Sequence, residues 1–91
     1  MQSLVVVDLT PVNKAVVAEY SALAAETLKP YSGEFIAKGH IEVLHGEAGH
    51  VMKAVIAFPD KESAKAWYNS AAYQAIVPLR DSGMHSQFHL V

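Results

Sequence analysis

The sequence predicts an α+β fold, in which a four-stranded antiparallel sheet carries two helices on one face. Four segments are rich in valine or alternate between apolar and polar residues, as strands do. Two other segments repeat apolar residues at helical spacing, and the order is strand, helix, strand, strand, helix, strand. The 91 residues are expected to form one domain, 1–91. Two βαβ halves in this order give the ferredoxin-like arrangement.

The first strand and helix are marked by clear end signals. Residues 4–9 are valine-rich, which suits a strand because valine loses side-chain freedom in a helix. Asn13 is expected to cap a helix over residues 13–29, since its side chain can accept a free backbone N–H. Pro30 then ends the helix and Gly33 provides the turn.

The central hairpin is predicted from alternation. Residues 34–45 alternate with period two, residues 46–49 are rich in glycine, and residues 50–58 form the returning strand. Gly39 is a candidate for a β-bulge, which would exchange the two faces of the strand after it.

The second helix is expected to start at Asp60, after the strand that ends with Phe58 and Pro59. Acidic residues at its start are favourable because that end of a helix is partly positive. Ser70 is a second possible cap, and Pro78 forbids a straight continuation. Residues 84–91 alternate again and predict the last strand.

The composition suggests self-association. Hydrophobic residues make up 52% of the chain and charged residues 18%, which is apolar for so small a protein. The sheet face away from the helices would expose apolar side chains among polar ones: Leu4, Val6, Ile36, Leu44, Val51, Val55 and Val91. A face of this kind usually packs against another sheet, so a symmetric homodimer is predicted.

Several classes of protein are disfavoured. The net charge is −2 and Arg80 is the single arginine, so nucleic-acid binding has no basic patch to rest on. Cysteine is absent, which excludes disulfides and thiolate chemistry. The start of the chain lacks a secretory signal pattern, and no apolar run has the roughly 20 residues that a spanning helix needs. A cytoplasmic location, with no membrane partner, is therefore expected.

Blocks of residues along nearly the whole chain resemble a known family. They include residues 5–8, 18–20, 33–36 and 41–46, and the most specific block is 58–74 with Trp67. The sequence resembles the small bacterial domain-of-unknown-function 1330 family of the dimeric α+β barrel superfamily. The loop at 46–49 looks short, and alanine replaces the proline usual near the start of the Tyr73 segment. The resemblance implies a homodimer whose two sheets face each other as a barrel, and it implies no reaction.

The five histidines do not predict a metal site. His85 and His89 share a strand face but lie roughly 13 Å apart along it, too far to chelate one ion. In a dimer, polar side chains could form one patch between the sheets: Asp8, Lys38, His40, Glu42, Lys53, His85, Gln87 and His89. A hydrogen-bonded network that fixes dimer register is favoured, and a buried acid–base site is the alternative. No metal is expected.

A pocket between sheet and helices is the second candidate site. Its predicted ligand-binding residues are Tyr20, Phe35, Trp67, Tyr68, Asn69 and Arg80, a mixture of aromatic bodies and polar tips typical of ligand pockets. A plain structural role is the competing interpretation for each. Trp67 and Tyr20 suit the core, Asn69 suits a cap or turn, and Arg80 suits a solvated or ion-paired side chain. His40 and Asn69 are weak candidates for a catalytic group.

These observations leave the function open between classes. One hypothesis is a protein that binds or transforms a small organic molecule without a cofactor. The alternative is a non-enzymatic assembly or regulatory module, in which the polar groups only specify pairing. Haem binding would need an axial histidine on the cavity side.

Overall fold

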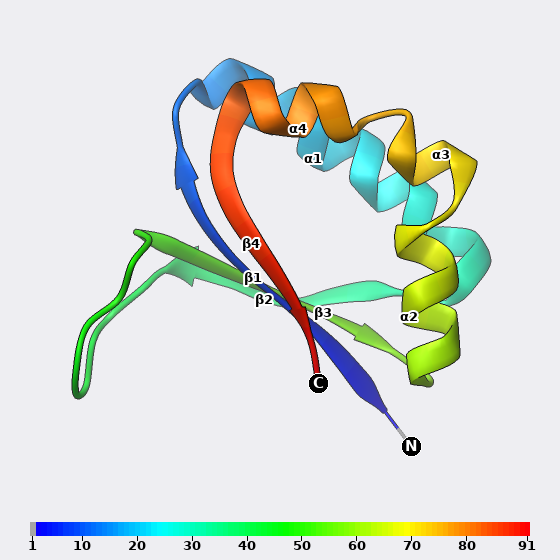
Figure 1. Ribbon diagram of the computed structural model, residues 1–91, viewed down its shortest axis with the longest axis horizontal. Helices are drawn as coiled ribbons and strands as arrows, with labels where there is room; N and C mark the ends of the chain where they lie inside the picture. Colours follow the sequence, from blue (N-terminus) through cyan, green and yellow to red (C-terminus); the bar gives the residue numbers. More distant parts are fainter. Residues whose placement is uncertain (1) are drawn as a thin grey trace.

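The computed structural model describes residues 2–91 and confirms the predicted fold class (Figure 1). The strands pair antiparallel in the order β2-β3-β1-β4, and the helices cover one face of the sheet. The elements are β1 (Ser3–Pro11), α1 (Lys14–Leu28), the 3₁₀ turn η1 (Lys29–Tyr31), β2 (Glu34–His40), β3 (Met52–Phe58), α2 (Lys61–Tyr68), α3 (Ala71–Gln74), α4 (Val77–Gly83) and β4 (Met84–Leu90).

The core lies between the sheet and the helices. Alternate residues of β1 are buried, which is the period of two expected of a strand with one covered face. The core side chains include Val5, Val7, Leu9, Tyr20, Ala24, Leu28, Ala54, Ile56, Phe58, Ala64, Trp67, Tyr73 and Met84. The other face of β1, with Leu4, Val6 and Asp8, is half-buried. One face of the sheet is thus packed and the other is open.

The β-bulge predicted at Gly39 is wrong in its position. The pairing of β2 with β3 shifts between Phe35 and Ala37, so Ile36 is the extra residue. Gly39 itself pairs regularly with Lys53. The prediction was based on the tendency of glycine to occur at bulges. In the structure, the pairing of β2 with β3 determines which residue is extra, and that residue is Ile36.

The central hairpin is more irregular than its alternation predicts. β2 ends at His40 and β3 begins at Met52, which leaves residues 41–51 as an arm that extends away from the sheet (Figure 1). One backbone bond, from Ile41 N–H to the carbonyl of Val51 at 2.9 Å, continues the ladder into the arm. Leu44 is 96% exposed near its end.

The predicted caps are confirmed. The side chain of Asn13 accepts the N–H of Val16 at 3.2 Å, and that of Asp60 accepts the N–H of Ser63 at 2.7 Å. These bonds start α1 and α2.

The second helical region is three short helices. Ser70 starts α3, where its hydroxyl accepts the N–H of Tyr73 at 3.2 Å, and Pro78 stands in the first turn of α4. Both breaks predicted from the sequence are therefore present. The breaks bend the chain, so that α2 and α4 lie at different places beside the sheet (Figure 1). Across residues 2–91, no helix combines the length and the apolar character needed to cross a bilayer.

Candidate functional site

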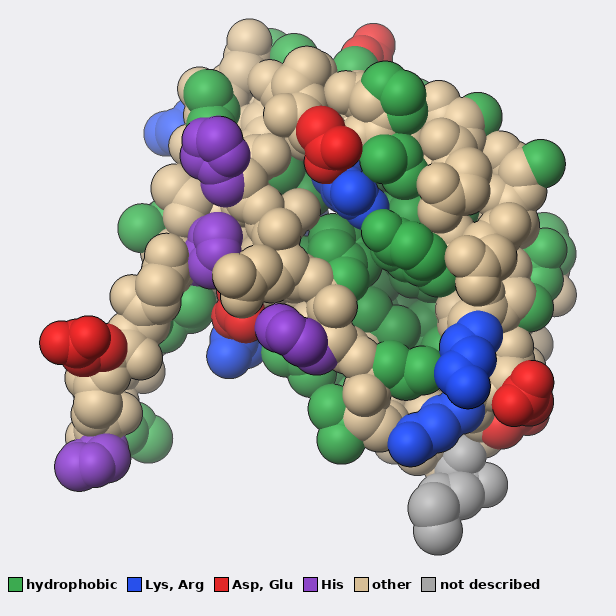
Figure 2. Space-filling model, in the orientation of Figure 1, with side chains coloured by type: hydrophobic (Ala, Val, Ile, Leu, Met, Phe, Trp, Pro, Cys, Tyr) green, Lys and Arg blue, Asp and Glu red, His purple; other side chains and the backbone are tan. Residues whose placement is uncertain are grey.

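A cleft opens between β4, α2 and α4. Its volume is about 370 Å³, and it is lined by Val5, Ala64, Lys65, Tyr68, Asn69, Arg80, Ser86, Phe88, His89 and Leu90. Figure 2 shows this side of the molecule hollowed, with hydrophobic side chains inside and basic side chains at the edge. Because β4 is an edge strand of the sheet, the cleft opens beside the sheet rather than through its centre.

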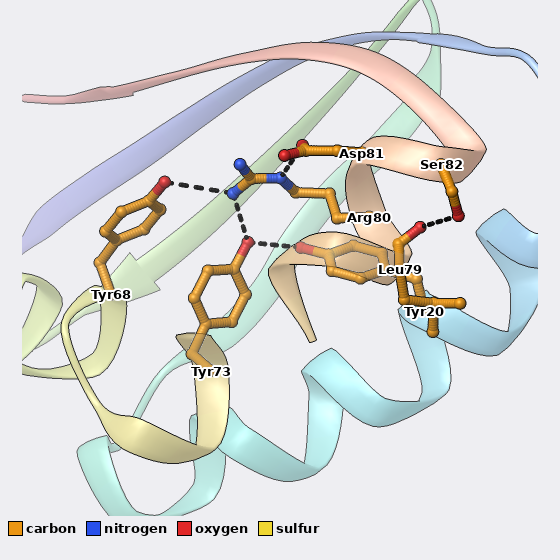
Figure 3. Close-up of polar contacts among 7 residues, drawn as sticks. All are labelled: Tyr20, Tyr68, Tyr73, Leu79, Arg80, Asp81 and Ser82. Carbon is orange, nitrogen blue, oxygen red and sulfur yellow. Dashed lines mark hydrogen bonds and ion pairs between the residues drawn. The ribbon is translucent and has the colours of Figure 1, made fainter. Parts of the chain in front are cut away.

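Arg80 is the principal polar group of the cleft. It lies in α4, and its side chain is only 11% exposed. Its Nη1 donates hydrogen bonds to the hydroxyl oxygens of Tyr68 at 3.1 Å and Tyr73 at 3.2 Å (Figure 3). Its Nε donates to the Asp81 carboxylate at 3.0 Å. Three partners from three helices therefore hold the guanidinium in one orientation.

Aromatic rings support the guanidinium from the side. The Cζ atom of Arg80 lies 4.9 Å from the ring centroid of Phe88 and 6.0 Å from that of Tyr68. A cation this close to a ring face is attracted by the ring's quadrupole, which partly replaces the water lost on burial. The same rings form the apolar wall of the cleft.

Two hydrogen-bond donors at this point have no protein acceptor. Within residues 2–91, Nη2 of Arg80 makes no hydrogen bond, and the Tyr68 hydroxyl accepts one but donates none. Every fully buried side-chain nitrogen or oxygen in the described chain has a partner, so Nη2 keeps some exposed surface, and Arg80 is one of the residues that line the cleft. A guanidinium cannot accept a hydrogen bond, so both groups offer hydrogens outward.

Behind the guanidinium lies a buried pair of phenols. The hydroxyls of Tyr20 and Tyr73 are 2.7 Å apart. Burial raises the pKa of Tyr20 strongly and that of Tyr73 as well, although the hydrogen bonds of Tyr73 to Tyr20 and Arg80 act in the opposite direction. Burial alone would lower the pKa of Arg80, but hydrogen bonds from its guanidinium to Tyr68 and Tyr73 raise it above its usual value. The cluster therefore combines neutral phenols with one fixed positive charge.

The six predicted ligand-binding residues fall into two groups. Tyr68, Asn69 and Arg80 line the cleft. Tyr20, Phe35 and Trp67 line a narrow apolar gap of about 40 Å³ on the other side of the core.

Trp67 and Asn69 have structural roles as well. Trp67 is fully buried, and its Nε1 donates to the Thr27 hydroxyl at 3.0 Å. Asn69 ends α2, and its side-chain nitrogen donates to the Lys65 carbonyl at 3.1 Å. Asn69 thus caps a helix and stands at the rim of the cleft.

The predicted polar patch is only partly present. Because the extra residue of β2 is Ile36, Lys38 and His40 pair with Ala54 and Met52 on the helix side of the sheet. Lys38 there donates to the Ser21 hydroxyl at 3.3 Å. Their assignment to the open face is therefore wrong, and His40 lies away from the cleft as well.

Glu42 lies in the arm, outside the sheet, so its placement on the sheet face is wrong as well. The remaining members of the patch lie on the open face as expected. His85, Gln87 and His89 pair with Thr10, Asp8 and Val6 of β1. Lys53 forms an ion pair with Asp8 at 3.2 Å. Within residues 2–91, no group of three or more His, Asp or Glu side chains is placed to hold a metal ion.

Sequence reasoning missed the wall that β4 contributes. Ser86, Phe88 and Leu90 line the cleft. The alternation of residues 84–91 placed these side chains on one face, and this was the available signal. Their approach to Arg80 depends on the direction in which the chain turns at the breaks of Ser70 and Pro78, and local patterns predict the breaks but not that direction.

Solved structures share the fold. A protein of unknown function from Rhodopseudomonas palustris superposes with a TM-score of 0.80 at 12% identity, covering 99% of this chain and 80% of that one. A dimeric ferredoxin-like protein of unknown function from Jannaschia sp. CCS1 gives 0.77 at 14%, covering 100% and 98%. SnoaB, a cofactor-independent oxygenase from Streptomyces nogalater, gives 0.73 at 11%, covering 99% and 90%. At these identities the likeness shows the fold alone.

Sequence comparison gives one further result. The model of the family described as "Domain of unknown function (DUF1330)" matches residues 2–91. No curated protein matches the chain.

Proposed function

This chain belongs to the DUF1330 family, and we propose that it binds a small organic molecule in the cleft between β4, α2 and α4. The observation that carries the proposal is the Arg80 guanidinium, which lines the cleft, is nearly buried, and has one nitrogen, Nη2, without a partner in residues 2–91. A guanidinium nitrogen can only donate hydrogen bonds, so an acceptor atom of a ligand would be the matching partner for Nη2.

The shape and lining of the cleft support the proposal. Ligand pockets in proteins span roughly 300–1,000 Å³ and combine apolar walls with a few polar groups. This cleft, of about 370 Å³, lies at the small end of that range. Phe88, Leu90 and Val5 provide apolar surface, and Tyr68, Asn69 and Arg80 provide polar tips.

A chemical reaction on the ligand is the finer form of this proposal. SnoaB has the same fold and is a cofactor-independent oxygenase, so the fold supports chemistry that needs no bound cofactor. In this chain, an enzyme would act on the ligand at the polar end of the cleft, where Arg80, Tyr68 and Asn69 meet.

The binding proposal is tested by filling the cleft. Ser86 is half-buried on the wall of β4, and Ser86→Phe would occupy the space of a ligand. Ser82→Phe, on the exposed side of α4, is the matched control. Native mass spectrometry and calorimetric titration with 2-naphthoate are expected to detect a ligand on the wild type and the control but not on Ser86→Phe. Equal binding by all three, or by none, would contradict the proposal.

We also propose that the protein is a homodimer joined through the open faces of its sheets. Val6 and Val55 are only half-buried on that face, and a sheet face with such residues is usually covered. The Jannaschia protein of the same fold is dimeric. Val55→Lys is expected to yield a monomer in light scattering, whereas Val12→Lys, at an exposed site outside the sheet face, should remain dimeric. A dimeric Val55→Lys protein would place the interface elsewhere.

A pure assembly module is the alternative function. The arm at residues 41–51 favours it, because Leu44 is 96% exposed and Val43 is 50% exposed on a segment outside the main sheet. An assembly module would bind no small molecule, and filling the cleft with Ser86→Phe would leave its self-association and cellular role unchanged. The titration above therefore distinguishes the two functions.

A further inference from the structure

The geometry of the cleft points to a ligand class: we infer that the ligand carries an oxyanion, such as a carboxylate or enolate, on a flat apolar body of one or two rings. The oxyanion would accept hydrogen bonds from Arg80 Nη2 and the Tyr68 hydroxyl. This inference rests on the proposed binding function and specifies its chemistry.

The unpartnered groups define the polar end of the ligand. Arg80 Nη2 and the Tyr68 hydroxyl both have hydrogens to donate, and both adjoin Nη1, to which Tyr68 is bonded at 3.1 Å. A ligand atom placed between them must be an acceptor, because a ligand N–H there would face two donors. An anionic oxygen is the strongest such acceptor for a guanidinium.

The orientation of Arg80 further restricts the contact. Arginine often binds a carboxylate through two parallel bonds from neighbouring nitrogens. Here Nη1 is engaged by Tyr68 and Tyr73, and Nε by Asp81, so neither two-nitrogen edge is free. Nη2 is the remaining nitrogen, and the second bond must come from Tyr68. The site therefore suits one oxygen held by two different side chains.

The charged residues that line the cleft have one sign, and the nearest acidic group is Asp81, outside the lining. Arg80 and Lys65 line the cleft, and its lining residues include no Asp or Glu. Asp81 bonds to the guanidinium, but its side chain is 61% exposed, so water weakens its charge. The cleft is basic although the chain as a whole carries a net charge of −2. An anion is thus favoured there over a cation.

The walls define the rest of the ligand. The apolar lining residues are Val5, Ala64, Phe88 and Leu90, and the Phe88 ring centroid lies 4.9 Å from Arg80 Cζ. Aromatic rings already cluster at this point, where the centroids of Tyr68 and Phe88 are 5.8 Å apart. A flat ring can pack against such surfaces with favourable edge or offset contacts. The volume of about 370 Å³ limits the body to roughly one or two rings.

The test compares two probes that share one ring system. 2-Naphthoate carries a carboxylate, whereas 2-naphthamide places an NH₂ group where the second oxygen would be. Calorimetric titration of the wild type is expected to give at least about tenfold tighter binding of the naphthoate, as hydrogen bonds to charged groups are the stronger ones. NMR titration should shift the backbone amides of Ser86 and Asn69 with both probes.

Two variants test whether Arg80 and Tyr68 cause the preference for naphthoate over naphthamide. Arg80→Lys keeps the positive charge but removes the planar guanidinium, and Tyr68→Phe removes one donor while keeping the ring. Each should reduce the preference for naphthoate severalfold. Tyr31→Phe, which removes a phenol outside the cleft, should leave it unchanged. Tyr68→Phe keeps the test valid if Arg80→Lys does not fold.

The possible outcomes test the oxyanion inference and the proposed binding function separately. Equal binding of both probes, or tighter binding of the amide, overturns the oxyanion while the binding function stands. A naphthoate preference that both Arg80→Lys and Tyr68→Phe retain also overturns it, because the oxyanion would then lie elsewhere. Failure of the wild type to bind either probe overturns both proposals.

Discussion

Two aromatic-lined spaces lie on the helix side of the sheet, and they differ in almost every physical respect. The gap beside Trp67 and Tyr20 measures about 40 Å³ and is nearly all apolar. The cleft beside Arg80 measures about 370 Å³ and carries free hydrogen-bond donors. α2 supplies Trp67 to the gap and Tyr68 to the cleft, so two neighbouring residues of one helix line two different spaces. Aromatic content alone therefore does not distinguish a core from a site.

Truncating Trp67 should have the largest effect. Trp67→Ala is expected to lower the free energy of unfolding by about 3–5 kcal/mol, because the side chain is fully buried and leaves a cavity. Chemical denaturation monitored by circular dichroism measures the change. Phe88→Ala, in the half-buried wall of the cleft, should cost less. An equal cost for the two variants would mean that the cleft is packed as firmly as the core.

Removing the Tyr73 hydroxyl should have an intermediate effect. Tyr73→Phe deletes the oxygen that bonds to both Tyr20 and Arg80, and leaves buried groups with fewer partners. The expected loss is about 1–3 kcal/mol of unfolding free energy, measured by the same denaturation. Tyr31→Phe serves as the control. A similar loss of unfolding free energy in that variant would show that the bonds of the Tyr73 hydroxyl contribute no more than an ordinary phenol does.

Alkaline solution should act on the same phenols. Burial holds the pKa of Tyr20 and Tyr73 above the ordinary value of 10.0, so in the folded protein they keep their protons after the unfolded chain has begun to lose them. Stability should therefore be unaffected below pH 10 and fall as the pH rises above it. Thermal unfolding between pH 8 and 11 measures this, and the Tyr20→Phe, Tyr73→Phe double variant should fall less steeply than the wild type.

The smallest effect concerns the start of α2, the helix that contributes residues to both spaces. Hydrogen bonds from the backbone and side chain of Ser63 lower the pKa of the exposed Asp60. The charged cap thus stabilises the fold above the ordinary carboxyl pKa, and this contribution is lost as the pH falls through the lowered one. The wild type should lose slightly more stability than Asp60→Asn between pH 5 and 2. Parallel melting curves for the two proteins would contradict this.

Local signals made part of this structure predictable. The caps at Asn13, Asp60 and Ser70 depend on hydrogen bonds spanning three residues, so the sequence contains the whole interaction. The position of the β-bulge is not a local property of this kind. It lies at Ile36 because of which residues of β3 pair with β2. Because the extra residue comes before Lys38 and was not predicted there, Lys38 and His40 were assigned to the wrong face.

The site was predictable in its parts and not in its assembly. Tyr68, Asn69 and Arg80 were identified as ligand candidates because of their chemistry, and they do line one cleft. Tyr20, Phe35 and Trp67 were grouped with them because the sequence does not show which part of the helix–sheet layer a side chain occupies. The contact between Phe88 and Arg80 joins the last strand to α4 through the bend of the chain, and only the tertiary structure contains it.

The hydrogen bonds that hold Arg80 have an entropic consequence. A free arginine side chain loses about 2 kcal/mol of rotamer entropy when it is immobilised. Tyr68, Tyr73 and Asp81 have already immobilised this one during folding. A ligand that reaches Nη2 therefore meets a preorganised donor. Most of the entropy of ordering this side chain is lost during folding, so it does not weaken ligand binding.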